Sequence, residues 1–149
     1  MRAVIFDVEN SSRVEHITRL LEYLGLAALD GSTDLLAVGN WVVVAQETAR
    51  ILARHGARLL HSAPAPRVKD WSDLRIAVDA GLWLGTARAG DALQIVTDDR
   101  AFDAVGDVAS GHGVHFERLS YRDLLARAAV EPIPPKRRTR RRRRAGRSK

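Results

Sequence analysis

The sequence predicts an α/β fold, a three-layer α/β/α sandwich around a mostly parallel five-stranded sheet. Five short runs that read as strands alternate with segments whose apolar residues recur at helical spacing. A helix between each pair of successive strands implies right-handed crossovers and parallel strands. The chain has 149 residues, 46% of them hydrophobic, which suffices for one domain with a modest core.

Turn and capping residues delimit the first two elements. Residues 2–6 form a β-rich run that ends at Asp7. Ser12 and Glu15 have the spacing of a capping box, in which two side chains satisfy the free amides of a first helical turn. A helix is therefore predicted to begin at Ser12 and to end before Gly25.

The next elements repeat this pattern. Residues 33–38 are predicted to form the second strand, and residues 42–55 a helix that ends at Gly56. A third strand is predicted at 57–61. The proline-containing segment at 62–69 is predicted to be a loop.

The second half of the domain continues the alternation. The predicted elements are a helix at 71–87, a strand at 92–97, a short helix at 102–109, a strand at 114–119 and a last helix at 121–129. The first of these helices carries on one face Leu74, Ala77, Val78, Gly81 and Leu82. This periodicity is what predicts the helix.

The net charge of +6 conceals an asymmetry between the body and the C-terminal end. Residues 132–149 contain ten of the 24 basic residues and no acidic ones, which leaves 14 basic and 18 acidic residues, a net charge of −4, in 1–131. The basic run at 136–144 repels itself and offers little apolar surface to bury, so it is predicted to be disordered. The sequence thus predicts a domain at 1–131 and a disordered basic tail at 132–149, led by a stiff proline-containing spacer.

The tail is predicted to bind phosphates. Each Arg or Lys that neutralises a phosphate releases counterions, which gives strong, salt-sensitive and sequence-independent affinity. The alternative is a solvated tail that binds any polyanion, including an acidic membrane surface. The basic residues predicted to contact nucleic acid are Lys69, Arg100, Arg137, Arg138, Arg140, Arg141, Arg142, Arg143 and Arg144.

Several other classes are excluded. Without cysteine, the chain cannot form disulfide scaffolds, cysteine-based zinc sites, iron–sulfur clusters or cysteine nucleophiles. No apolar run approaches the roughly 18 residues needed to cross a bilayer. Arg2 lies within the first apolar run, which is unlike a secretory signal. We therefore expect a reducing cytoplasmic location and no membrane partner.

Acidic residues are predicted to converge at one edge of the sheet. Ligands of open parallel sheets bind outside the carboxyl ends of the strands. Asp7 follows the first strand, Asp73 lies at the start of the helix at 71–87, and Asp99 follows the fourth strand. Oxygen-only clusters of this kind suit Mg²⁺ or Mn²⁺, so these three aspartates are predicted to bind a metal ion. Other polar residues expected near this edge are Asn40, Asp98 and Asp103.

Each of these residues also has a structural interpretation. Asp73 would complement the helix dipole if Asp70 is the N-cap. Asn40 is a natural N-cap for the helix at 42–55, and residues 97–100 could be an ordinary strand-to-helix turn. Asp79 points about 120° away from Asp73 and lies about 9 Å further along the helix, so it is expected to pair with an Arg instead.

Four segments resemble the NYN branch of the PIN-like nuclease superfamily. Residues 4–10 (Val-Ile-Phe-Asp-Val-Glu-Asn) look like its opening strand followed by Asp-x-x-Asn. Residues 69–79 are similar to its Lys-x-x-x-Asp…Asp helix, and 93–102 to its strand followed by Ser-Gly-Asp-x-Asp-Phe. Residues 113–116 look like its last strand.

The resemblance implies a metal-dependent ribonuclease that cuts single-stranded or structured RNA, with the metal on Asp7, Asp73 and Asp99. It implies that Asn10 orients Asp7 or a substrate phosphate, and it keeps Asp79 as a possible site residue. The sequence departs from the pattern at Ala101, where the family usually has another acid. Asp98, in place of a Gly, or Asp103, after Phe102, could substitute for it. A homodimer is compatible with the sequence.

Two other functions fit parts of the sequence. A catalytically weak or inactive PIN-like protein could act as an RNA-binding adaptor, and Ala101 favours this alternative. A phosphatase-like hydrolase could use Asp7 as a phosphoryl acceptor, but it needs a second Asp at position 9, where this chain has Glu9.

Overall fold

The structure of the chain is a computed structural model. It describes residues 1–9, 11–26, 31–63 and 69–130. Asn10 and the basic tail predicted at 132–149 lie outside these ranges.

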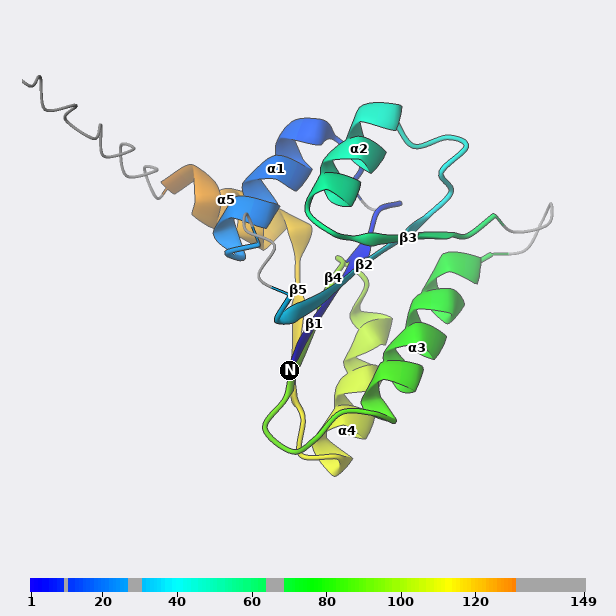
Figure 1. The fold of residues 1–149 in the computed structure, drawn as a ribbon, viewed down its shortest axis with the longest axis vertical. Helices are drawn as coiled ribbons and strands as arrows, with labels where there is room; N and C mark the ends of the chain where they lie inside the picture. Colours follow the sequence, from blue (N-terminus) through cyan, green and yellow to red (C-terminus); the bar gives the residue numbers. More distant parts are fainter. Residues whose placement is uncertain (10, 27–30, 64–68, 131–149) are drawn as a thin grey trace, which may run out of the picture.

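Five strands form one parallel sheet, as the sequence predicts (Figure 1). In chain order they are β1 (Arg2–Asp7), β2 (Thr33–Gly39), β3 (Arg58–His61), β4 (Ala92–Val96) and β5 (His115–Leu119). Their order in the sheet is β3-β2-β1-β4-β5, and every neighbouring pair is parallel. The chain runs outward from β1 to β3 and then returns to the other side of β1. The strand order therefore reverses between β1 and β4, which is the place where open sheets bind ligands.

Helices cover both faces of the sheet and complete the predicted three layers. They are α1 (Val14–Tyr23), α2 (Gln46–Arg54), α3 (Trp71–Leu84), α4 (Asp103–Gly111) and α5 (Tyr121–Val130). Figure 1 shows α1, α2 and α5 on one face and α3 and α4 on the other. Among the described residues, no helix combines the length and the apolar character that a membrane span requires.

The central strand β1 joins two hydrophobic cores. Its side chains alternate between the faces of the sheet because successive residues of a strand point in opposite directions. Val4 and Phe6 pack with α1, α2 and α5, whereas Ala3 and Ile5 pack with α3 and α4. All four are completely buried. A strand buried on both faces reads as a continuous apolar run, which is why the sequence predicts β1 so clearly.

The predicted capping box does not form. The N-cap of α1 is Arg13, and no side chain caps this helix end. The carbonyl of Ser12 instead accepts a hydrogen bond of 2.5 Å from the Thr48 hydroxyl of α2. This tertiary contact fixes Ser12 one residue before the cap position, so the spacing to Glu15 no longer fits the motif.

The prediction that Asn40 caps the second helix is wrong. Helix α2 begins at Gln46 rather than at Val42, with Ala45 at its N-cap. Asn40 closes a separate turn. Its Oδ1 accepts the Val42 N–H at 3.2 Å, and its backbone carbonyl accepts the N–H groups of Val43 and Val44. An Asn side chain that binds the backbone two residues ahead favours a turn over a helix.

The apolar face that the sequence assigns to the third helix does not pack on the sheet. Leu74, Val78 and Leu82 are exposed, with exposed fractions of 62%, 59% and 68%. The side chains of α3 that enter the core are Ile76, Ala80, Trp83 and Leu84. The helix has apolar residues on two faces, and periodicity alone cannot tell which of them the sheet covers.

Candidate functional site

Asp7 lies at the switch point of the sheet, at the end of β1 and beside the end of β4. It is only 1% exposed. Its Oδ2 accepts a hydrogen bond of 2.9 Å from the hydroxyl of Thr97, the residue after β4. Its backbone carbonyl accepts a bond of 3.0 Å from the hydroxyl of Tyr121, the first residue of α5. Two distant segments of the chain thus fix Asp7.

Thr97 also links Asp7 to Asp99. The Thr97 hydroxyl oxygen accepts the Asp99 N–H at 3.2 Å. The Asp99 carboxylate caps a short 3-10 helix (Arg100–Phe102) by accepting the Ala101 N–H at 2.8 Å through Oδ1. The turn at 97–100 is therefore a capped strand-to-helix turn, and it also holds Asp99 at the same sheet edge as Asp7. Ala101 contributes a backbone donor where the NYN pattern usually has an acid.

Asp73 lies in a negative environment at the start of α3. Its side chain is half-buried. Burial raises its pKa above 3.8, and the carboxylates of Asp99, Asp70 and Glu9 raise it further by charge repulsion. We call Asp7, Glu9, Asp70, Asp73 and Asp99 the acidic edge. Glu9, two residues beyond Asp7, was not among the predicted site residues. It lies in the turn after β1, where strand alternation does not predict the direction of a side chain.

Asp70 occupies the N-cap position of α3, as expected, but its side chain makes no capping hydrogen bond. Its backbone is left-handed, with φ of 56°, a conformation that Asp adopts more readily than most residues. Asp70 therefore contributes charge to the acidic edge without capping the helix.

The other predicted acidic residues are engaged by cations. Asp79 Oδ2 lies 2.7 Å from Arg75 Nε, which confirms the predicted pairing of Asp79 with an Arg. Asp103 Oδ1 lies 2.8 Å from Arg118 Nε, and Asp98 Oδ2 lies 3.4 Å from Arg122 Nε. These three carboxylates are thus structurally committed, which leaves the acidic edge as the candidate site.

The predicted metal ligands share one edge but do not form a finished metal site. Within the described ranges, no three carboxylate or imidazole groups are arranged so that they could hold a metal ion as they stand. The donor chemistry of the acidic edge, oxygen atoms from repelling carboxylates, suits a hard divalent cation. A three-ligand set would have to assemble as such an ion binds.

The remaining predicted residues lie around this edge or outside the described ranges. Lys69 and Arg100 are exposed, directly before α3 and at the start of the 3-10 helix respectively. Asn10 and the seven predicted RNA-binding arginines of the tail lie outside the described residues.

Tyr121 shows how burial serves the site. It is 2% exposed, and its ring lies 6.4 Å from that of Phe6. Burial raises the pKa of its hydroxyl well above 10, and the nearby Asp7 and Asp98 charges raise it further. The hydroxyl therefore stays protonated and donates to the Asp7 carbonyl throughout the neutral range.

Removing this hydroxyl should destabilise the fold. Tyr121→Phe leaves the buried Asp7 carbonyl without this donor, so we expect the free energy of unfolding to fall by about 1–2 kcal/mol. Urea unfolding measures the change. The control is Tyr23→Phe, at a tyrosine that is 40% exposed. Equal stability of the two variants would contradict a structural role for the Tyr121 hydroxyl.

Neither models of protein families nor curated proteins match this chain.

Proposed function

We propose that this chain is a metal-dependent endoribonuclease of the PIN-like kind, which hydrolyses RNA phosphodiester bonds at the acidic edge. The observation that carries the proposal is the environment of Asp73. Burial raises the pKa of Asp73, and the carboxylates of Asp99, Asp70 and Glu9, which gather near it, raise that pKa further. Like charges gathered at the switch point of a parallel sheet are typical of a divalent-cation site.

Asp7, Asp73 and Asp99 would hold one or two Mg²⁺ or Mn²⁺ ions. Asp98 and Asp103, which are paired with Arg122 and Arg118, are not expected to substitute for the acid missing at position 101. Such an ion, when bound, lowers the pKa of a coordinated water and stabilises negative charge on the phosphate. The protein's own residues would orient the reaction. Thr97 fixes Asp7, and the Ala101 N–H fixes Asp99. No serine or cysteine nucleophile is needed.

The basic residues would bring RNA to an otherwise acidic body. A net charge of −4 in residues 1–131 repels a polyanion. The tail arginines would raise the local concentration of RNA through contacts to its phosphates. Lys69 and Arg100, exposed beside the acidic edge, would contact the strand nearer to the cleaved bond.

A labelled single-stranded RNA tests the activity. We expect cleavage in the presence of Mg²⁺ or Mn²⁺ and none in EDTA. RNA binding without cleavage in either metal would instead support the second candidate, a non-catalytic RNA-binding adaptor. Two observations favour that candidate: Ala101 stands where the NYN pattern has an acid, and the described carboxylates form no ready three-ligand set.

The raised pKa of Asp73, which results from burial and from the neighbouring carboxylates, gives a separate test based on stability. Because the folded-state pKa of Asp73 is raised above 3.8, the protein loses stability as the pH rises from 3.8 through the raised value. Asp73→Asn removes this loss, so the variant should be more stable than the wild type at neutral pH. The difference in free energy of unfolding should grow as the pH rises from 3.8 to the raised pKa and stay constant at higher pH. Urea unfolding between about pH 3 and about pH 7 measures the difference.

The matched control is Asp107→Asn, at an exposed residue of α4. Adding Mn²⁺ at neutral pH should raise the melting temperature of the wild-type protein more than that of Asp73→Asn. Stability curves of wild type and Asp73→Asn that run parallel across the whole pH range would contradict the raised pKa of Asp73.

A further inference from the structure

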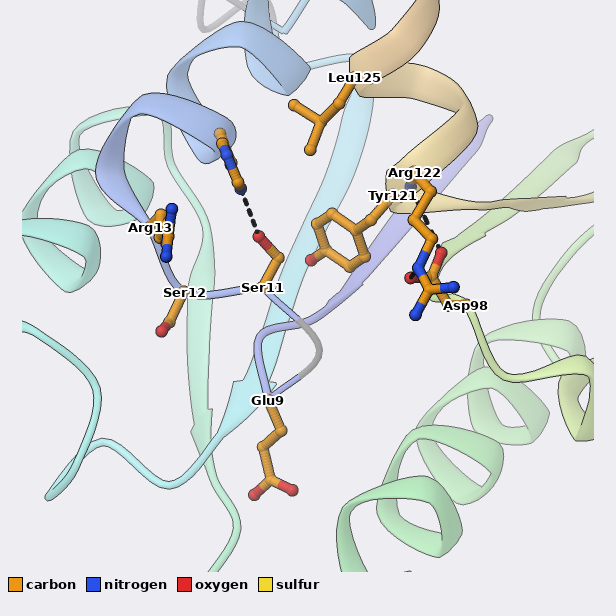
Figure 2. A pocket seen from close by; sticks show the side chains of 9 residues that line it. Glu9, Ser11, Ser12, Arg13, Asp98, Tyr121, Arg122 and Leu125 are labelled. Carbon is orange, nitrogen blue, oxygen red and sulfur yellow. Dashed lines mark hydrogen bonds and ion pairs between the residues drawn. The ribbon is translucent and has the colours of Figure 1, made fainter.

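A second feature of the same sheet edge is a pocket on the α1 and α5 side. Its volume is about 400 Å³, within the range of small-ligand sites. The loop before α1 and the first turns of α1 and α5 line it (Figure 2). Tyr121, whose hydroxyl holds the Asp7 carbonyl, and Asp98, which follows Thr97, both form part of its wall. The pocket therefore adjoins the acidic edge.

Two arginines border the pocket from different helices. Arg13 precedes α1 and Arg122 lies in the first turn of α5, and Figure 2 shows them on opposite sides of Ser11 and Tyr121. Arg13 is exposed and forms no ion pair with the described residues. Arg122 uses only Nε toward Asp98, at 3.4 Å, and its side chain is 89% exposed. Both guanidinium groups therefore keep donors for a ligand.

The two acids of the lining affect this charge differently. Asp98 offsets part of the Arg122 charge: its Oδ1 accepts the Ser120 hydroxyl at 2.7 Å and the Arg122 N–H at 3.4 Å, and its Oδ2 lies 3.4 Å from Arg122 Nε. Glu9 lies at the rim, and its carboxylate points away from Tyr121 and Leu125 (Figure 2). The Glu9 charge instead raises the pKa of Asp73. Glu9 thus belongs to the acidic edge and also lies at the rim of the pocket.

The rest of the lining favours a sugar–phosphate unit over a base. Ser11 and Ser12 supply hydroxyl groups, and the Ser11 hydroxyl lies 3.1 Å from His16 Nδ1. Arginine and serine side chains are typical phosphate and sugar contacts. Tyr121 is 2% exposed, so its ring face offers no platform on which a base could stack. The first turn of α1, which no side chain caps, adds partial positive charge to the same pocket.

We propose that this pocket binds the backbone phosphate and ribose of a nucleotide beside the cleaved bond. This inference rests on the proposed function. Arg13 and Arg122 hold the phosphate, and Ser11 and Ser12 contact the phosphate or the ribose. The pocket positions the strand without reading its sequence, and the acidic edge next to it receives the bond to be cut.

Titration of the full-length protein with uridine 3′-monophosphate in EDTA tests the pocket without any need for cleavage. We expect backbone amide NMR signals of residues 11–16 and 122–125 to shift, and uridine without phosphate to leave them unchanged. Arg13→Gln and Arg122→Gln should each weaken binding about fivefold, in the range of one partly exposed charged contact. The matched controls are Arg19→Gln in α1 and Arg127→Gln in α5, both at arginines outside the pocket, and they should bind as the wild type does.

Three results would overturn the inference: shifts confined to the tail at 132–149, unchanged affinity in both pocket variants, or inorganic phosphate bound as tightly as the nucleotide. The last result would identify a site for free phosphate. The outcome is distinct from that of the cleavage assay. Nucleotide binding here without RNA cleavage would refute the nuclease alone, and cleavage without such binding would refute the pocket alone.

Discussion

Replacing Asp7 by Asn is expected to lower the rate of RNA cleavage by about 10³-fold, the equivalent of roughly 4 kcal/mol of transition-state stabilisation. The substitution removes one negative charge from the predicted metal site and retains an oxygen that can accept the Thr97 hydroxyl bond. The fold should therefore persist while the site loses affinity for the cation. Single-turnover cleavage of labelled RNA in Mn²⁺, at saturating protein, measures the effect.

The matched control is Asp79→Asn. Asp79 lies on α3 like Asp73, but its carboxylate is paired with Arg75 at 2.7 Å. The Asp79→Asn protein should cleave RNA within about twofold of the wild-type rate, since surface ion pairs contribute little to a distant site. Wild-type cleavage by a folded Asp7→Asn protein would refute the assignment of the site. Equal losses in the two variants would place the catalytic acids elsewhere on the sheet edge.

Neutralising the basic tail should weaken RNA binding with little effect on the chemical step. The variant replaces by Gln the seven arginines Arg137, Arg138, Arg140, Arg141, Arg142, Arg143 and Arg144. For each phosphate that the tail no longer neutralises, the dependence of log affinity on log salt decreases by about 0.7 for a single strand, so the slope should fall by up to about 5. At low salt the KM for RNA should rise by about 10-fold or more, while the single-turnover rate at saturation stays near that of the wild type.

A tail in which the same seven positions are Lys separates charge from arginine-specific contacts. It retains the positive charges, so it should keep most of the affinity and of the salt dependence. Fluorescence anisotropy of a labelled RNA at several salt concentrations gives both quantities. If the Gln variant binds RNA as tightly as the wild-type protein and with the same salt slope, the tail has no part in recognition.

The sequence predicts the sheet well because buried parallel strands are short apolar runs, and β1 is an example with four completely buried residues in succession. Helix ends are predicted less well because tertiary contacts compete with local signals. The Thr48 hydroxyl binds the Ser12 carbonyl, and the capping box that includes Ser12 does not form. Asn40 closes a turn, and α2 therefore begins only at Gln46. In α3, apolar residues lie on two faces of the helix, so their spacing does not show which face is buried.

The candidate site was predictable where topology alone decides it. Residues that follow parallel strands share one sheet edge, which brings Asp7 and Asp99 together with the start of α3. The residues that support them could not be found in this way. Tyr121 reaches the Asp7 carbonyl across 114 positions of sequence, and the separation of Asp98 from the acidic edge depends on Ser120 and Arg122. Such contacts depend on the packing of α5 against the end of β1.

We propose that Asp7, Asp73 and Asp99 bind the same divalent cation. An anomalous difference map from crystals soaked in Mn²⁺ tests it most directly. We expect a strong peak at the carboxyl ends of β1 and β4, within coordination distance of carboxylate oxygens from all three residues, and no such peak in crystals of Asp7→Asn. A map without manganese at this edge, or with manganese bound only by other residues, would refute a cation shared by Asp7, Asp73 and Asp99.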